Sequence, residues 1–154
     1  MNFSEFLQAL IAAPADIVFV GLGNLARGDD AAGLLLLGEL NKRRELGAAH
    51  FIDAGTNPEN VLQQILDFAP KLVVFIDAVR ATGTAGEMRW IEPHDLDSAA
   101  ISTHAFSIRM IEEYLKANAP MEVGYLGIIP QSTRIGEGLS PAVRQSIDRF
   151  FEIP

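Results

Sequence analysis

The sequence predicts a single α/β domain built on a five-stranded, mostly parallel sheet. Two runs are apolar at every position, Ile17-Val18-Phe19-Val20 and Leu72-Val73-Val74-Phe75-Ile76. This pattern is typical of strands that are buried on both faces of a sheet. In addition, β-rich runs alternate with helical patterns along most of the chain, which favours parallel strands joined by crossover helices. We therefore expect three layers, with helices on both faces of the sheet.

Five short β-rich runs define the expected strands, and the fourth is an exception to the parallel order. The runs span residues 17–21, 50–53, 71–77, 87–92 and 122–129. The segment between Asp77 and Glu87 is turn-like and too short for a crossover helix. Parallel neighbours need a connection of about a dozen residues or more. We therefore predict that the fourth strand runs antiparallel in an otherwise parallel sheet.

Capping residues indicate where the helices begin. We expect Asp29-Asp30 to cap one helix and Asn57-Pro58 to start the next, because a capping residue followed by proline is a helix start signal. Ser102-Thr103 and Ser140-Pro141 should begin two more helices. An additional N-terminal helix should end before Pro14. The expected helices span residues 3–13, about 29–46, 57–69, 102–118 and from 140 onward.

Composition narrows the possible functions. The chain has 154 residues and no cysteine, which excludes a disulfide framework, a Cys-based zinc site, an iron–sulfur cluster and a cysteine nucleophile. The net charge is −8 and no basic cluster exceeds Lys42-Arg43-Arg44, so we expect no nucleic-acid partner. The run Leu34–Leu37 is far shorter than the ~20 apolar residues of a membrane span. We expect a cytoplasmic monomer that does not associate with membranes.

Acidic side chains follow three of the expected parallel strands, at the edge where open α/β sheets bind ligands. They are Asp29-Asp30, Asp53 and Asp77. Carboxylates ligate divalent cations, and imidazole suits nickel, zinc and copper. His104 lies at an expected helix start, where the helix dipole disfavours the imidazolium form and leaves a neutral ligand. Asp30, Asp77 and His104 are therefore candidates for one shared cation site, whereas we interpret Asp53 mainly as a turn residue that bonds backbone N–H groups.

Other chemistry is less favoured by the sequence. Residues 21–26 fit the relaxed dinucleotide fingerprint G-x-G-x-x-A after a strand. However, Asp29-Asp30 would place two carboxylates where the phosphates of a nucleotide would lie. Ser102 and Ser107 lie near His104 in the sequence, but there is no G-x-S-x-G elbow for a serine nucleophile and no H-E-x-x-H zinc motif.

Five short motifs follow one another along residues 17–150. They are Gly21–Asn24 with Gly28–Gly33, then Asp53–Asn60, Ile76–Ala78, Ser102–His104 and Gly127–Pro130. In this order they resemble the motifs of nickel–iron hydrogenase maturation proteases. The resemblance implies one protease domain over residues 1–154 with a phosphorylase/hydrolase-like fold, in which residues 1–14 would be an N-terminal addition.

The resemblance also implies a function. Members of that family remove the C-terminal extension of a nickel-containing hydrogenase large-subunit precursor, and they recognise nickel that is already bound to the substrate. In that family an acidic residue, an Asp and a His contact the nickel, and these positions match Asp30, Asp77 and His104. The same three residues are therefore the expected catalytic residues of an aspartic-type endopeptidase. Because nickel arrives with the substrate, no permanently bound cofactor is expected.

Two alternatives stay open at this point. A non-catalytic nickel chaperone would use the same three residues to deliver the metal. A nucleotide-binding oxidoreductase domain would use Gly21, Gly23 and Ala26. The sequence also departs from the family pattern at Ala31, where glycine is common.

Overall fold

The computed structural model describes residues 1–96 and 105–152, and it contains the predicted mixed sheet. The strand order is β2-β1-β3-β5-β4, and β1, β2, β3 and β5 are mutually parallel where they pair. β4 pairs with β5 in the antiparallel direction, which confirms the prediction for the fourth strand. The strands are β1 (Ile17–Leu22), β2 (His50–Gly55), β3 (Leu72–Ala78), β4 (Met88–Ile91) and β5 (Glu122–Ile128).

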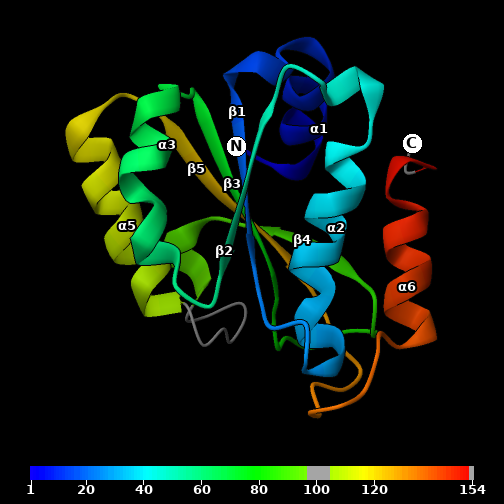
Figure 1. Ribbon diagram of the computed structural model, residues 1–154. Helices are drawn as coiled ribbons and strands as arrows, with labels where there is room; N and C mark the ends of the chain where they lie inside the picture. Colours follow the sequence, from blue (N-terminus) through cyan, green and yellow to red (C-terminus); the bar gives the residue numbers. More distant parts are fainter. Residues whose placement is uncertain (97–104, 153–154) are drawn as a thin grey trace.

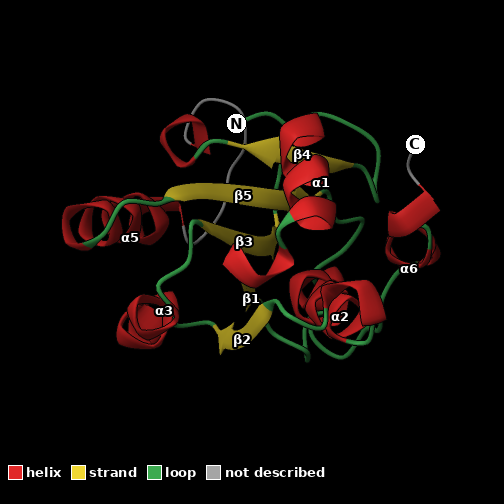
Figure 2. Cartoon of the chain, turned by 90° about the horizontal axis from the view of Figure 1, so that it is seen from above, coloured by secondary structure: helices red, strands yellow, loops and turns green. Residues whose placement is uncertain are grey.

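Helices cover both faces of the sheet, as expected (Figures 1 and 2). One face carries α1 (Phe3–Ala12), α2 (Ala32–Asn41) and α6 (Pro141–Asp148). The other face carries α3 (Leu62–Phe68) and α5 (Ala105–Asn118). In the part of the chain that the structure describes, no helix has the length and apolar character needed to cross a membrane.

The position of β3 between two helical layers explains its continuous apolar run. Val74 and Ile76 pack in the cluster with α1, α2 and α6, whereas Val73 and Phe75 pack in the cluster with α3 and α5. Because successive side chains of a strand point to opposite faces, such a strand must be apolar at every position. Asp77 ends the run, and by this alternation its side chain lies on the face covered by α3 and α5.

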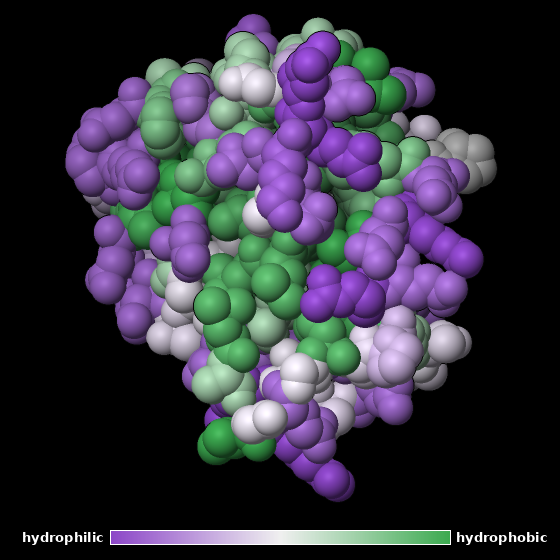
Figure 3. Space-filling view, turned by 45° about the vertical axis from the view of Figure 1, so that its right-hand side comes forward, coloured by the Kyte–Doolittle hydropathy of each residue, from purple (hydrophilic) through white to green (hydrophobic). Residues whose placement is uncertain are grey.

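The layer formed by α1, α2 and α6 extends to the surface through side chains that are only partly buried. Figure 3 shows the side of the molecule where α2 and α6 lie, with apolar side chains gathered between polar ones. Apolar atoms contribute roughly half of the accessible surface of folded proteins, so partly exposed apolar side chains are expected here. The partly buried apolar residues that pack against this layer include Phe3, Leu7, Leu35, Phe51, Met88 and Leu139.

The start of α2 differs from the prediction. Asp29-Asp30 does not cap this helix: α2 begins at Ala32, and its N-cap Ala31 makes no side-chain cap bond. Residues 28–31 form a separate 3-10 turn, η2, and the helix ends at Asn41 rather than near residue 46. Gly33 lets the start of α2 lie directly on the strand ends, since a Cβ there would be 2.3 Å from the Ile76 carbonyl oxygen. The prediction failed because one of the two aspartates has a long-range partner.

The other predicted helix starts had mixed outcomes. Ser140 caps α6, because its hydroxyl accepts the Val143 N–H at 3.4 Å. Asn57 makes no side-chain cap bond, and a 3-10 turn (Pro58–Val61) precedes α3. Ser102 and Thr103 lie outside the described residues.

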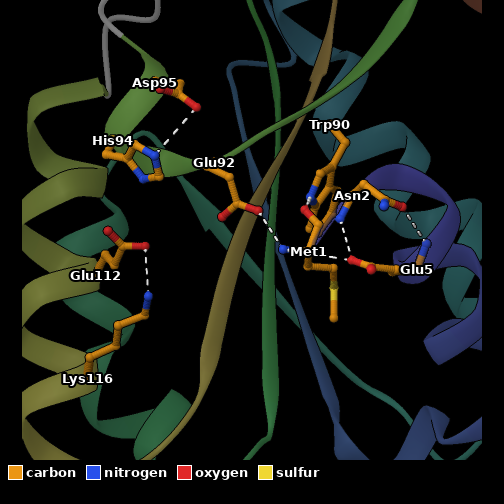
Figure 4. A network of polar contacts seen from close by, with 9 residues as sticks. All are labelled: Met1, Asn2, Glu5, Trp90, Glu92, His94, Asp95, Glu112 and Lys116. Atoms are coloured by element: carbon orange, nitrogen blue, oxygen red, sulfur yellow. Dashed lines mark hydrogen bonds and ion pairs between the residues drawn. The ribbon is translucent and has the colours of Figure 1, made fainter.

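The N-terminal segment is fastened to β4 by a polar network (Figure 4). The Met1 amino group donates to Glu92 at 3.1 Å, and this hydrogen bond raises the pKa of the amino group above its ordinary value. The Trp90 indole N–H donates to the Met1 carbonyl at 2.8 Å. Asn2 and Glu5 form a capping box at the start of α1. The network holds α1 in a fixed place over the sheet.

Aromatic stacking adds to this attachment and gives it a spectroscopic reporter. Phe6 is fully buried and stacks on Trp90 with ring centroids 4.5 Å apart. Trp90 is the single tryptophan of the chain. We expect Phe6→Ala to cost about 3 kcal/mol of the free energy of unfolding, because it leaves a cavity in the core. It should also shift the tryptophan emission to longer wavelength, since the indole becomes more exposed.

The control for this prediction is Ile11→Ala on the same helix, where the side chain is 83% exposed. It should change neither the emission maximum nor the denaturation midpoint in urea. Equal emission and equal midpoints for Phe6→Ala and the native protein would show that α1 does not depend on this stack.

Candidate active site

The carboxyl ends of the parallel strands meet at one edge of the sheet, the lower edge in Figure 1. Gly21 of β1 pairs with Asp53 on one side and with Ile76 on the other. Asp77 of β3 pairs with Gly127 of β5. The loops that follow these strands therefore gather at the edge where the candidate site was predicted.

Asp77 carries a buried carboxylate at this edge. Its side chain is 1% exposed, and its Oδ2 accepts a hydrogen bond from the Tyr125 hydroxyl at 2.9 Å. A buried carboxylate is costly without such partners, so the bond both stabilises it and fixes its orientation. Tyr125 was not among the residues predicted for the site. The sequence does contain a signal, a tyrosine inside an apolar strand. A buried tyrosine hydroxyl needs a hydrogen-bond partner, so such a residue indicates a polar group nearby.

Asp30 lies on the turn that covers this edge. It belongs to η2, its N–H donates to the Arg27 carbonyl at 3.0 Å, and its carbonyl accepts the Asn24 N–H at 3.2 Å. Its side chain is half-buried, and η2 lies against β3, the strand that carries Asp77. Two of the three candidate ligands are thus on segments that contact each other.

His104, the third candidate, lies outside the described residues. The helix that follows it, α5, begins at Ala105 and packs on the sheet face to which Asp77 belongs. Within residues 1–96 and 105–152, no three His, Cys, Asp or Glu side chains are grouped to hold a metal ion. The shared site of Asp30, Asp77 and His104 therefore stays a prediction.

Asp29, the neighbour of Asp30, has a different role that the sequence did not predict. It is fully buried. Its Oδ1 accepts the Ser140 N–H at 2.8 Å, and its Oδ2 accepts the Ser140 hydroxyl at 2.8 Å. Oδ2 also accepts the N–H groups of Gln131 at 2.8 Å and Ser132 at 3.3 Å. One carboxylate thus holds both ends of the segment 131–140.

Backbone hydrogen bonds join this segment to the turn that carries Asp30. The Gly28 N–H donates to Glu137 at 3.0 Å, and the Gly136 N–H donates to Ala26 at 2.8 Å. Gly28 has a φ of +54°, and a Cβ there would lie 2.7 Å from the Ser132 carbonyl oxygen, so glycine is required. The loops 24–31 and 131–140 therefore form one fixed rim beside the candidate site.

The glycine-rich turn does not form an open phosphate cradle. Gly23 has a φ of +144°, and a Cβ there would lie 2.1 Å from the Asp30 carbonyl oxygen. The space next to this glycine is thus filled by the chain's own backbone. The fingerprint-like spacing of residues 21–26 reflects tight packing of the turn rather than nucleotide binding.

Asp53, His50 and His94 each contact other parts of the chain. Asp53 is exposed, and its Oδ1 accepts the Gly55 N–H at 2.9 Å, which confirms its interpretation as a turn residue. His50 begins β2 and stacks on Phe68 with centroids 3.9 Å apart. His94 is exposed on a 3-10 turn next to Asp95.

Comparison with known proteins identifies the family. Residues 35–153 match the family model HycI, described as hydrogenase maturation protease. The chain belongs to the hydrogenase maturation protease family. The matched region includes Asp77 and His104 and begins after Asp30. The match confirms the resemblance that the five motifs indicated.

Relatives and solved structures agree with this assignment. The hydrogenase 3 maturation protease of Escherichia coli K12 is 28% identical over 136 residues, covering 88% of this chain and 86% of the relative. The crystal structure of the [NiFe] hydrogenase maturation protease HycI from Thermococcus kodakarensis KOD1 superposes with a TM-score of 0.82 at 30% identity, covering 96% of this chain and 95% of that one. The solution structure of the endopeptidase HycI from E. coli gives a TM-score of 0.73 at 25% identity, covering 88% and 86%.

The protein is therefore a hydrogenase maturation endopeptidase. This favours the peptidase over the two alternatives that the sequence left open, the nickel chaperone and the nucleotide-binding oxidoreductase. Membership of the family implies metal-assisted processing and a hydrogenase large-subunit precursor as the substrate.

Proposed function

We propose that this hydrogenase maturation protease removes the C-terminal extension of a nickel-containing large-subunit precursor, and that it does so after nickel is seated in the substrate. The observation that carries the proposal is the buried Asp77 carboxylate at the carboxyl edge of the sheet, held by the Tyr125 hydroxyl. The family assignment supports it, since the matched region contains both Asp77 and His104.

In this proposal Asp30, Asp77 and His104 contact the nickel that the substrate carries. Two carboxylates and one imidazole are too few for a closed metal site, so the remaining ligands come from the precursor. Cleavage thereby depends on a correctly loaded substrate. The nickel acts as a Lewis acid on the scissile carbonyl, or it positions the chain while an aspartate acts as the general base.

A comparison of nickel-loaded and nickel-free precursor tests this function. We expect the enzyme to release a short C-terminal peptide from the loaded precursor and to leave the nickel-free precursor intact, because recognition needs the metal. Mass spectrometry of both products measures the cut. Equal cleavage of the two precursors would contradict nickel recognition, and nickel transfer without cleavage would support the chaperone instead.

A further inference from the structure

A hollow of about 650 Å³ lies beside the candidate site. Its walls are Arg80, residues 130–134 and Glu137. This volume is within the range of about 300–1,000 Å³ that ligand sites occupy. The hollow therefore has room for a side chain of a bound polypeptide.

The hollow is close enough to the candidate site to contact the same substrate. Arg80 follows Asp77 by three residues, so the two Cα atoms are at most about 11 Å apart. An extended peptide covers that distance with about three residues. A side chain that enters the hollow would thus belong to the precursor segment that flanks the cut.

The hollow carries positive charge in a protein whose net charge is −8. Arg80 is exposed, and no acidic side chain that the structure describes forms an ion pair with it. The Arg134 Nη1 lies 4.0 Å from the Glu137 Oε1, and the Arg134 side chain is 84% exposed. Such an exposed ion pair contributes little to stability, so Arg134 can exchange Glu137 for another partner. Arg27 lies nearby, since its Nε donates to the Thr133 carbonyl at 3.4 Å.

The wall of the hollow is held in place before any ligand arrives. Asp29 bonds Gln131, Ser132 and Ser140, which are at both ends of the loop that forms this wall. A site that is already ordered loses less conformational entropy on binding. The loop is therefore suited to recognition rather than being a mobile connection.

We propose that this hollow binds an acidic side chain of the precursor within about four residues of the scissile bond, with Arg80 as the principal ligand. A guanidinium pairs with a carboxylate through two parallel hydrogen bonds. The neighbouring Asp30 and Asp77 repel the same carboxylate. Attraction by Arg80 and repulsion by these aspartates together fix how the substrate chain lies across the edge. This inference rests on the proposed function and assigns its substrate specificity.

Arg80→Gln tests the inference, with Arg44→Gln as a matched control. Arg44 is also an exposed arginine, but it lies on a 3-10 turn before β2, at the opposite edge of the sheet. For the nickel-loaded precursor we expect Arg80→Gln to raise KM about tenfold, the effect of one lost charge-assisted hydrogen bond. Its kcat should stay within about twofold and its Tm should not change, because Arg80 positions substrate rather than reacting. Arg44→Gln should leave both constants unchanged.

Precursor variants identify the partner of Arg80. Acidic residues within four positions of the cut are replaced singly by their amides, and one replacement should raise KM for the native enzyme but not for Arg80→Gln. Reversal of both charges, with Arg80→Glu and lysine in the precursor, should restore part of the loss. Three results would overturn the inference. KM could be unchanged in Arg80→Gln, or the loss could be confined to kcat. Alternatively, every precursor variant could raise KM by the same factor for Arg80→Gln as for the native enzyme. Failure of the native enzyme to cut the loaded precursor would instead refute the proposed function.

Discussion

Asp77→Asn should slow cleavage of the nickel-loaded precursor roughly a hundredfold or more, the range expected when a catalytic charge or general base is lost. Asparagine has nearly the same shape, and its carbonyl oxygen can still accept the Tyr125 hydroxyl that now bonds Asp77. The fold should therefore survive. The charge that attracts the cation is lost, and with it the capacity to take a proton.

The same assay applies to the other two candidates. His104→Ala and Asp30→Asn should show losses of similar size, because all three residues are proposed to contact one nickel ion. Asp30 does not cap α2, because the N-cap of this helix is Ala31, which makes no side-chain cap bond. A loss of activity at Asp30 is then not explained by a lost helix cap.

Asp53→Asn is the matched control for these carboxylates. Asp53 lies at the same edge, and its Oδ1 accepts the Gly55 N–H, a bond that the asparagine carbonyl oxygen can also accept. We expect this variant to cleave at nearly the native rate, as followed by release of the C-terminal peptide, with thermal melts run in parallel. Native rates for Asp77→Asn, His104→Ala and Asp30→Asn together, with normal melts, would show that the site is elsewhere.

Asp29→Ala should be the most destabilising of the substitutions at this edge, with a loss of about 4 kcal/mol in the free energy of unfolding. The carboxylate is fully buried and accepts from three backbone N–H groups and one hydroxyl, all in the segment 131–140. Its removal leaves buried donors without an acceptor, which costs more than the bonds contribute. For a domain of this size the melting temperature should fall by about 10 °C.

Two further variants separate the contributions of the Asp29 carboxylate and the Ser140 hydroxyl to the free energy of unfolding. Asp29→Asn keeps one acceptor oxygen but turns an amide donor toward backbone donors, so it should also destabilise strongly. Ser140→Ala removes the hydroxyl that bonds Asp29 and caps α6, and we expect a loss of about 1 kcal/mol. Urea denaturation followed by circular dichroism measures all three. If Asp29→Ala and Asp30→Asn have the same denaturation midpoint in urea, the adjacent aspartates do not have the separate roles that the structure indicates.

The sequence determined which segments form the sheet and in which direction the fourth strand runs. The apolar runs of β1 and β3 predicted strands with two buried faces, and the short connection after Asp77 predicted an antiparallel β4. Both conclusions depend on local patterns, namely side-chain alternation and the length that a crossover requires. The ordered motifs likewise indicated the family, and the turn role of Asp53 followed from residues two positions apart.

Only the tertiary structure separated Asp29 from Asp30. Two adjacent aspartates before a helix fit the pattern of a cap, but Asp29 bonds Ser140, 111 positions away in the chain. Asp77 and Tyr125 are 48 positions apart and meet because β3 and β5 are neighbours in the sheet. The arginines of the hollow come from separate loops in the same way. Contacts between residues so far apart in the chain produce no periodic pattern in the sequence. They arise only when the sheet brings distant loops to one edge.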